Sequence, residues 1–158
     1  RALNAAGQRQ VPDLFWAASC MAKRTDVHRT DPLSIAVLAR AARMMERVLA
    51  LDENFYYGGP HMFFGVYYGG RAPMFGGDFA KAEMHFAKAH AATQGKLLLG
   101  DVLYAEFLAR QQLDRSAFHE KLSAVIAASD DVLPEMALAN RVAQQRAHYL
   151  LSKEAEWF

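Results

Sequence analysis

The stretch that decides the fold runs from Phe64 to Phe86 and reads FGVYYGGRAPMFGGDFAKAEMHF. Its first part places Gly65 directly after a bulky aromatic residue, with a second aromatic, Tyr68, almost one helical turn further on. Its last part places the small residue Ala82 one turn before Phe86. Small residues let two helices approach closely, and large residues fill the space between them. The stretch therefore predicts a pair of packed helices.

Helix pairs with this spacing of small and large residues are typical of tetratricopeptide (TPR) repeats. The preceding segment, Ala50–Asn54, resembles the end of such a repeat, although its last residue is asparagine where proline is usual. A weaker match to the same repeat pattern follows at Leu99-Gly100, Leu103-Tyr104, Phe118 and Leu122. The distance from Gly65 to Ala82 exceeds the regular repeat by about five residues, and the surplus is the segment 71–77. A non-repeating helical bundle would contain much the same residues, so that alternative stays open.

Helical periodicity continues over the rest of the chain, and no alternating pattern is long enough to predict a strand. We expect helices at about 13–22, 33–51, 56–70, 79–95 and 96–112, and two more that begin near 115 and 134. Their starts are expected at Asp31-Pro32, Asp78, Asp114 and Pro134. The side chains expected to face inward are Ile35, Leu38, Ala42, Met45, Leu49, Phe79, Ala82, Phe86, Ala89, Phe118, Leu122, Val125, Ile126, Leu138, Val142, Tyr149 and Leu150. The expected fold is all-α, with TPR-like antiparallel helical hairpins (about seven helices) in a right-handed superhelical array.

Composition agrees with a single TPR-like helical domain over residues 1–158. Hydrophobic residues make up 53% of the chain and charged residues 22%, which is typical of a globular protein. The formal net charge is +1, and no basic stripe is present, so nucleic acid is not an expected partner. The most apolar stretch, Leu97–Ala109, is interrupted by Asp101 and Glu106, which predicts a buried helix and not a membrane span.

The single cysteine, Cys20, excludes an internal disulfide. The run Ala17–Cys20 is similar to a lipoprotein cleavage site, but it lies within an apolar helical pattern, and we expect a buried thiol instead. The chain begins at Arg1 without a methionine, so we expect a trimmed piece of a longer precursor that lacks its signal and lipid-anchor segment.

Around the decisive stretch, the sequence resembles one particular family. The segments His61–Tyr68, Arg71–Asp78, Lys81-Ala82 and His85-Phe86 are similar to those of the TatT family, the T components of tripartite (TRAP) periplasmic transport systems. Further matches, in order along the chain, are Phe15–Ala18, Val102–Glu106, Asp114-Arg115, Phe118, Asn140 and Leu150-Leu151.

The resemblance implies a helical periplasmic lipoprotein that forms a homotrimer and associates with the substrate-binding P component. It implies no catalytic residue. We therefore expect a non-catalytic accessory protein, not an enzyme, that binds the P component and a small hydrophobic or amphipathic ligand. The alternative is a general TPR scaffold that holds a peptide or protein in its concave groove.

The candidate binding residues come mainly from an aromatic and glycine-rich region. Ten of the eighteen aromatic residues and seven of the ten glycines lie between Phe55 and Phe86. Such residues can line a ligand cleft or a subunit contact, although they can equally pack the core of a hairpin. The expected ligand- or partner-binding residues are Trp16, Tyr57, His61, Tyr68, Arg71, Met74, Phe75 and Tyr104. Of these, Tyr57, His61, Tyr68, Arg71 and Met74 are expected to be the exposed ones.

The segment 71–77 is expected to project, because an irregular buried backbone would leave polar groups unpaired. Pro73 stiffens it, so it suits recognition. The competing hypothesis is that Met74 and Phe75 fold back and fill the core.

Other chemistry finds no support in the sequence. Gly76-Gly77 lacks the lysine and serine or threonine of a phosphate-binding loop. His85 and His90 stand five positions apart and do not share a helical face, so no zinc site is expected. We therefore expect no catalytic residue, no metal ligand and no cofactor.

Overall fold

The computed structural model describes residues 2–27 and 33–158, and over these ranges its regular elements are all helices. The expected helix start at Asp31-Pro32 lies outside the described residues. The chain divides into two compact units, Arg1–Phe63 and Phe64–Phe158. The all-α expectation is confirmed, while the right-handed superhelix and the single domain stay predictions.

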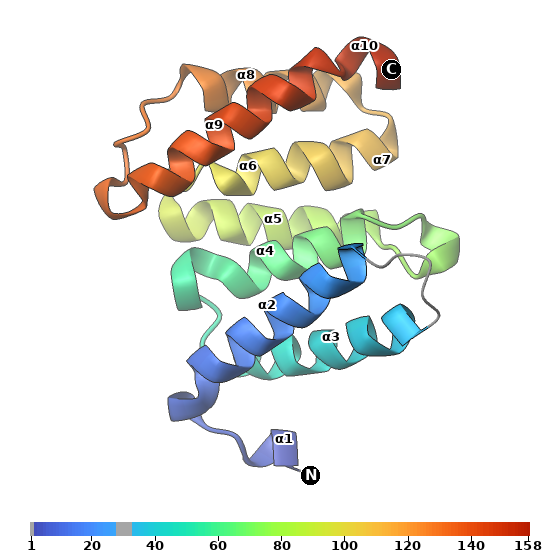
Figure 1. The fold of residues 1–158 in the computed structure, drawn as a ribbon, viewed down its shortest axis with the longest axis vertical. Helices are drawn as coiled ribbons and strands as arrows, with labels where there is room; N and C mark the ends of the chain where they lie inside the picture. The colour runs from blue at the N-terminus through green and yellow to red at the C-terminus, as the bar shows by residue number, and fades with distance from the viewer. Residues whose placement is uncertain (1, 28–32) are drawn as a thin grey trace. The chain divides into compact units, whose positions relative to one another are not determined.

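The first unit is built on two long helices. Its elements are α1 (Ala2–Ala5), the 3-10 turn η1 (Gln8–Gln10), α2 (Val11–Val27), α3 (Leu33–Leu51) and the first part of α4 (Phe55–Gly69). Helices α2 and α3 lie side by side (Figure 1). Phe15 and Ala18 from α2, and Met45 and Val48 from α3, are buried because apolar residues recur along one face of each helix.

Two sequence expectations in this unit are wrong. Ile35 was expected to face inward, but its side chain is 79% exposed, because the buried stripe of α3 runs through Ala41, Met45 and Val48. The thiol of Cys20 is exposed and not buried. Cys20 stands two positions after the buried Ala18, and two positions turn a helix through about 200°, so the two side chains point in opposite directions.

The second unit holds the larger core. Its elements are the rest of α4, the 3-10 turn η2 (Pro73–Phe75), α5 (Phe79–Thr93), α6 (Leu99–Tyr104), the π-helical segment η3 (Ala105–Ala109), α7 (Arg110–Gln112), α8 (Arg115–Ala127), the 3-10 turn η4 (Pro134–Met136), α9 (Ala137–Ser152) and α10 (Glu154–Trp157). Figure 1 shows α5, α6, α8 and α9 as successive neighbours. Phe118, Leu122 and Leu150 are among the fully buried residues of this core.

The hairpin that the decisive stretch predicts is present between α4 and α5. A Cβ atom added at Gly65 would lie 2.8 Å from the ring of Phe86, so only glycine allows this ring to pack against the α4 backbone. Ala82 and Phe86 are both buried, as expected. The interpretation of these positions as the small and large residues of packed helices is therefore confirmed.

Both expected aspartate caps are present. The Asp78 carboxylate accepts a hydrogen bond from the Lys81 backbone N–H (3.0 Å), and the Asp114 carboxylate accepts one from the Ala117 backbone N–H (2.9 Å). These bonds satisfy backbone donors that the first turn of a helix leaves without a partner.

Three helices differ from their expected form. The helix predicted at 96–112 begins only at Leu99 and changes to π-helical geometry at 105–109. The last helix begins with a 3-10 turn at Pro134, and its α-helical part starts at Ala137. In α4, the expected helix from Tyr56 is interrupted, since Tyr56, Tyr57 and Gly58 have left-handed backbone angles.

The buried face of α9 was also predicted incorrectly. Leu150 is buried as expected, but Leu138, Val142 and Tyr149 are 78%, 56% and 51% exposed. The face that packs inward instead carries Asn140, Ala143 and Ala147. The two alanines let α9 approach its neighbours closely, so the helix buries its small side chains and leaves a stripe of larger ones outside. None of the described helices is long and apolar enough to span a membrane.

Candidate functional site

The segment 71–77, called here the 71–77 loop, has a defined backbone. Three hydrogen bonds close it internally, from the N–H groups of Phe75 and Gly77 to the carbonyl of Ala72 (2.9 and 3.2 Å) and from Gly76 to Pro73 (3.0 Å). A Cβ atom at Gly77 would lie only 1.9 Å from the carbonyl oxygen of Arg71. The two ends of the loop therefore approach so closely that only glycine fits at this position. These contacts hold the loop in one form.

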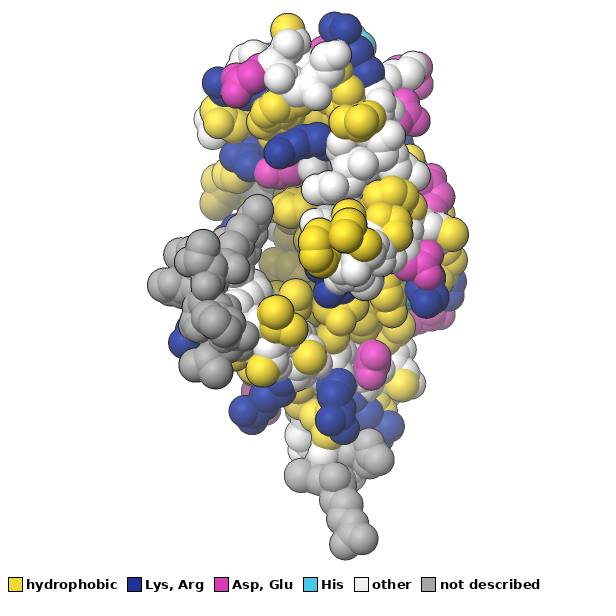
Figure 2. Space-filling model, turned by 90° about the vertical axis from the view of Figure 1, so that its right-hand side faces the viewer, with side chains coloured by type: hydrophobic (Ala, Val, Ile, Leu, Met, Phe, Trp, Pro, Cys, Tyr) yellow, Lys and Arg dark blue, Asp and Glu magenta, His cyan; other side chains and the backbone are white. Residues whose placement is uncertain are grey.

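The loop presents two large apolar side chains to solvent. Met74 is 82% exposed and Phe75 is 69% exposed, so the hypothesis that they fill the core is wrong. Figure 1 draws this segment at the right-hand edge, between α4 and α5, and Figure 2 shows the corresponding side of the molecule, where apolar side chains protrude. An exposed apolar pair on a fixed backbone is a feature of recognition surfaces.

Arg71 lies at the base of the loop, where the end of α4 fixes its guanidinium group. Its Nε donates a hydrogen bond to the carbonyl oxygen of Tyr67 (3.0 Å), and its Cζ lies 4.0 Å from the centre of the Tyr67 ring. Its Nη2 is buried and has no hydrogen-bond partner among the described residues. A buried donor without a partner is rare and needs an explanation.

Tyr68 belongs to a group of packed aromatic rings next to the loop. Its ring stacks on those of Phe64 and His85, with centroids 6.0 and 5.9 Å apart, and meets Tyr67 edge-on at 5.2 Å. Its backbone carbonyl accepts a hydrogen bond from the N–H of Asp78 (3.1 Å), which ties the end of the loop to α4. The structure therefore brings Tyr68 and Arg71 together at the base of the loop.

Tyr104 lies on α6 and contacts α5. Its ring packs edge-on against Phe86, and its hydroxyl donates to the Glu83 carboxylate (3.0 Å). Burial, together with this hydrogen bond, raises the pKa of the Tyr104 hydroxyl to about 12. The hydroxyl is thus held in its protonated, donating form.

The other three candidates belong to the first unit. Trp16 is 47% exposed and its ring meets that of Tyr56 edge-on at 4.9 Å. Tyr57 has left-handed backbone angles (φ 60°, ψ 39°). His61 is only 2% exposed, with its Nε2 3.2 Å from a carboxylate oxygen of Glu53, so the expectation that its side chain is exposed is wrong.

The left-handed run from Tyr56 to Gly58 is a feature that sequence analysis missed. Three consecutive residues have positive φ angles, and two of them are tyrosines, for which this conformation is strained. The Tyr56 ring packs against Phe15 as well as Trp16, so the turn is held by an aromatic cluster. The only sequence signal was the pair Gly58-Gly59, which marks a backbone that departs from regular helix.

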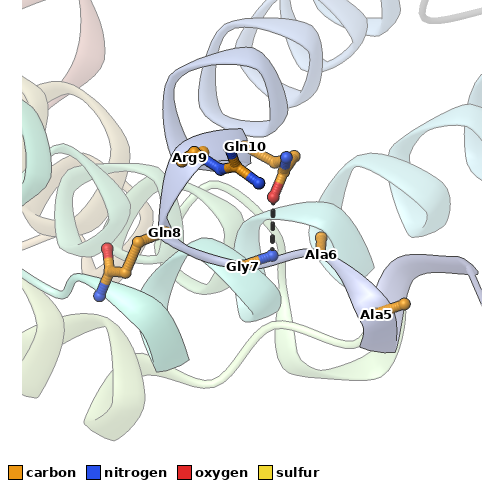
Figure 3. Close-up of a pocket in the computed structure, with 6 residues that line it drawn as sticks. All are labelled: Ala5, Ala6, Gly7, Gln8, Arg9 and Gln10. Atoms are coloured by element: carbon orange, nitrogen blue, oxygen red, sulfur yellow. Dashed lines mark hydrogen bonds between the residues drawn. The ribbon is translucent and has the colours of Figure 1, made fainter.

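Two surface hollows lie elsewhere in the described chain. One is lined by the continuous segment 5–10, where the Gly7 N–H donates to the Gln10 side chain at 2.9 Å (Figure 3). The other surrounds Glu154, whose carboxylate pairs with Arg115 (2.8 Å) and His119 (2.9 Å), and these hydrogen bonds lower the pKa of the Glu154 carboxyl. No three His, Cys, Asp or Glu side chains of the described residues are grouped to hold a metal ion.

Comparison with known proteins identifies one family. The family model described as TRAP transporter T-component (TAtT) matches residues 1–158. No curated protein matches the chain.

Proposed function

Because the chain belongs to the TRAP transporter T-component family, we propose that it acts in the periplasm as a non-catalytic accessory protein that binds the substrate-binding P component. The match covers the whole chain, which supports the proposal. In the proposal, the 71–77 loop forms the docking element, and a small, partly apolar solute binds beside it.

The observation that carries this proposal is the exposure of Met74 and Phe75 on a backbone closed by its own hydrogen bonds. A fixed loop loses little conformational entropy when it docks, so the burial of its side chains contributes more fully to affinity. Methionine and aromatic side chains are also enriched at protein interfaces. Exposure of these two apolar side chains contributes nothing to the stability of a monomer. A docking role accounts for it.

A separate surface is proposed for self-association. The family resemblance implies a homotrimer, and the exposed stripe of Leu138, Val142 and Tyr149 on α9 supplies a face suited to it. Burial of this stripe against another copy would remove apolar area from water, at roughly 25 cal/mol per Å². Docking and trimer formation would then use different faces.

Paired double variants test both assignments. Met74→Ser with Phe75→Ser should weaken P-component binding by about tenfold or more and leave the trimer intact, since two exposed anchors are lost. Leu138→Ser with Val142→Ser should shift the protein toward monomer. Ile35→Ser, at an equally exposed apolar position (79%), is the control and should change neither property. Titration calorimetry measures the first property and analytical ultracentrifugation the second.

The outcomes that contradict the proposal are clear. Unchanged P-component binding by the loop variant, at an unchanged melting temperature, would remove the loop as docking element. Sedimentation of the wild-type protein as a monomer at micromolar concentration would contradict the proposed trimer.

A further inference from the structure

Two aromatic side chains of the first unit form an exposed corner, called here the Trp16–Tyr56 corner. Trp16 lies on α2 and Tyr56 at the start of α4, and their rings meet at 71° with centroids 4.9 Å apart. Trp16 is 47% exposed and Tyr56 is 41% exposed, so both rings remain in contact with solvent. Two open rings nearly at right angles can both contact one small ligand.

The backbone that carries the Tyr56 ring is strained. Tyr56 and Tyr57 have φ angles of 47° and 60°, which side-chain-bearing residues disfavour. Such strain persists only where the surrounding structure maintains it, and it is concentrated at ligand-binding and switch regions. Phe15 provides the support here, because its ring lies 5.8 Å from that of Tyr56 and packs directly on the backbone of Gly59. The Tyr56 ring is therefore held beside Trp16 in the ligand-free protein, and a ligand would have little to rearrange.

An acidic side chain adjoins this corner. Asp13 is exposed and stands three positions before Trp16 on α2, so the two residues share a helical face. Long side chains of a helix lean toward its amino terminus, which directs the Trp16 ring over the turn that contains Asp13. The Asp13 carboxylate forms no hydrogen bond or ion pair with the residues that the structure describes. It is thus available to a positively charged ligand.

The rest of this helical face leaves the corner open. Ala17 and Cys20, which follow Trp16 on the same face of α2, are exposed and have small side chains. The nearest basic residues along the chain, Arg9 and Lys23, each stand seven positions from Trp16, about two helical turns away. The corner therefore combines aromatic faces with a negative charge, and no cation of its own helix lies next to it.

We propose that the Trp16–Tyr56 corner binds the quaternary ammonium group of a small organic cation, with Asp13 as the counter-ion. The negatively charged faces of tryptophan and tyrosine rings attract cations, and tryptophan does so best. A quaternary ammonium group is the cation that aromatic corners recognise most readily, because its methyl groups contact the rings while its charge interacts with them. This site lies in the first unit, so it is independent of the docking role proposed for the 71–77 loop.

The test uses the whole chain and three probes: choline, n-butylammonium, and dimethylbutanol, the uncharged analogue of choline in which carbon replaces nitrogen. Ligand-observed nuclear magnetic resonance titrations, which follow the alkyl protons of each probe, give the Kd values. Choline should bind at least about tenfold more tightly than dimethylbutanol, which has the same shape without the charge. It should also bind more tightly than n-butylammonium, since a primary ammonium is more strongly hydrated.

Three variants assign the binding to these residues. Trp16→Leu should weaken choline binding by about tenfold or more, and Trp16→Phe should weaken it less, because phenylalanine retains a ring with a weaker attraction for cations. Asp13→Asn should weaken it by about threefold or more, since the counter-ion is lost. Glu46→Gln is the matched control, because it removes the same charge from an exposed position on α3 of the same unit, and it should bind choline as the wild type does.

Circular dichroism melts show whether each variant is folded, and Trp16→Phe keeps the test valid if Trp16→Leu does not fold. Failure of the wild type to bind choline overturns the proposal, as does unchanged binding by Trp16→Phe together with Asp13→Asn. Equal binding of choline and dimethylbutanol would show an apolar surface only and also overturns it. Tighter binding of n-butylammonium than of choline would show that the corner fits the lysine of a partner protein, which excludes the quaternary ammonium ligand.

Discussion

At the scale of the residue, Asn140 shows how one polar side chain organises the second unit. It is fully buried, and its Oδ1 accepts a hydrogen bond from the N–H of Leu98 (3.0 Å). Its Nδ2 donates to the carbonyls of Lys96 (3.0 Å) and Asp130 (3.4 Å). These are backbone groups of irregular segments, which have no helical partners of their own. Asn140 therefore connects α9 to the segments that precede α6 and η4.

Asn140→Ala should lower the free energy of unfolding by about 1–3 kcal/mol, because the buried N–H of Leu98 would lose its partner. Asn140→Asp should also destabilise the protein, since a carboxylate cannot donate to the two carbonyls. Gln144→Ala serves as the control, because Gln144 is half-buried and donates to the carbonyls of Val125 and Ala128 from a site that water can reach. Urea denaturation followed by circular dichroism measures all three, and equal midpoints for wild type and Asn140→Ala would contradict the prediction.

At the scale of the element, α4 departs most from the simple helix. Its amino-terminal residues Tyr56, Tyr57 and Gly58 turn in the left-handed sense before the right-handed helix continues. Pro60 lies just after this turn, at the start of the right-handed helix. Proline has no backbone N–H, and at this position no helical hydrogen bond is lost by its absence. The Phe15 ring lies 2.6 Å from where a Cβ of Gly59 would stand, so α2 packs directly on the backbone there.

Two glycine substitutions should therefore have opposite effects. Gly58→Ala places a side chain at φ 75° and should destabilise the protein by about 1–2 kcal/mol. Gly100→Ala, within α6, meets no atom within 4 Å and should stabilise it by about 0.5–1 kcal/mol, because alanine favours helix. Thermal unfolding of the two variants gives the sign of each effect, and a Gly58→Ala protein as stable as the wild type would show that the turn is not left-handed.

At the scale of the whole molecule, the main question is whether the two compact units unfold together. A length of 158 residues is typical of one domain, and we propose that the chain behaves as one. The chain has two tryptophans, and each unit holds one of them, Trp16 in the first and Trp157 in the second.

The two tryptophans allow each unit to be followed separately. Trp157→Phe leaves Trp16 as the fluorescent reporter of the first unit, and Trp16→Phe leaves Trp157 as the reporter of the second. If the chain is a single cooperative domain, each variant should give the same urea midpoint by fluorescence as by circular dichroism. Midpoints that differ between the two methods within one variant would indicate two domains.

The sequence by itself determined the helical class, the family, the α4–α5 hairpin and the caps at Asp78 and Asp114. These depend on local chemistry, since a cap needs only a carboxylate near its own helix start, and a hairpin of close helices needs small residues at fixed spacing. The projection of the 71–77 loop was also predictable. Its extra residues form irregular backbone, whose polar groups would lack partners if it were buried between the packed helices.

Only the tertiary structure decided which face of α9 is buried. Leu138 and Val142 fit an inward stripe as well as Ala143 and Ala147 do, and the choice depended on how closely neighbouring helices approach α9. The contact of His61 with Glu53, the exposure of Cys20 and the burial of Arg71 Nη2 likewise depend on side chains from turns and neighbouring elements. Periodicity describes one helix at a time, whereas burial is a property of the surfaces that meet, so the face turned inward is set by packing.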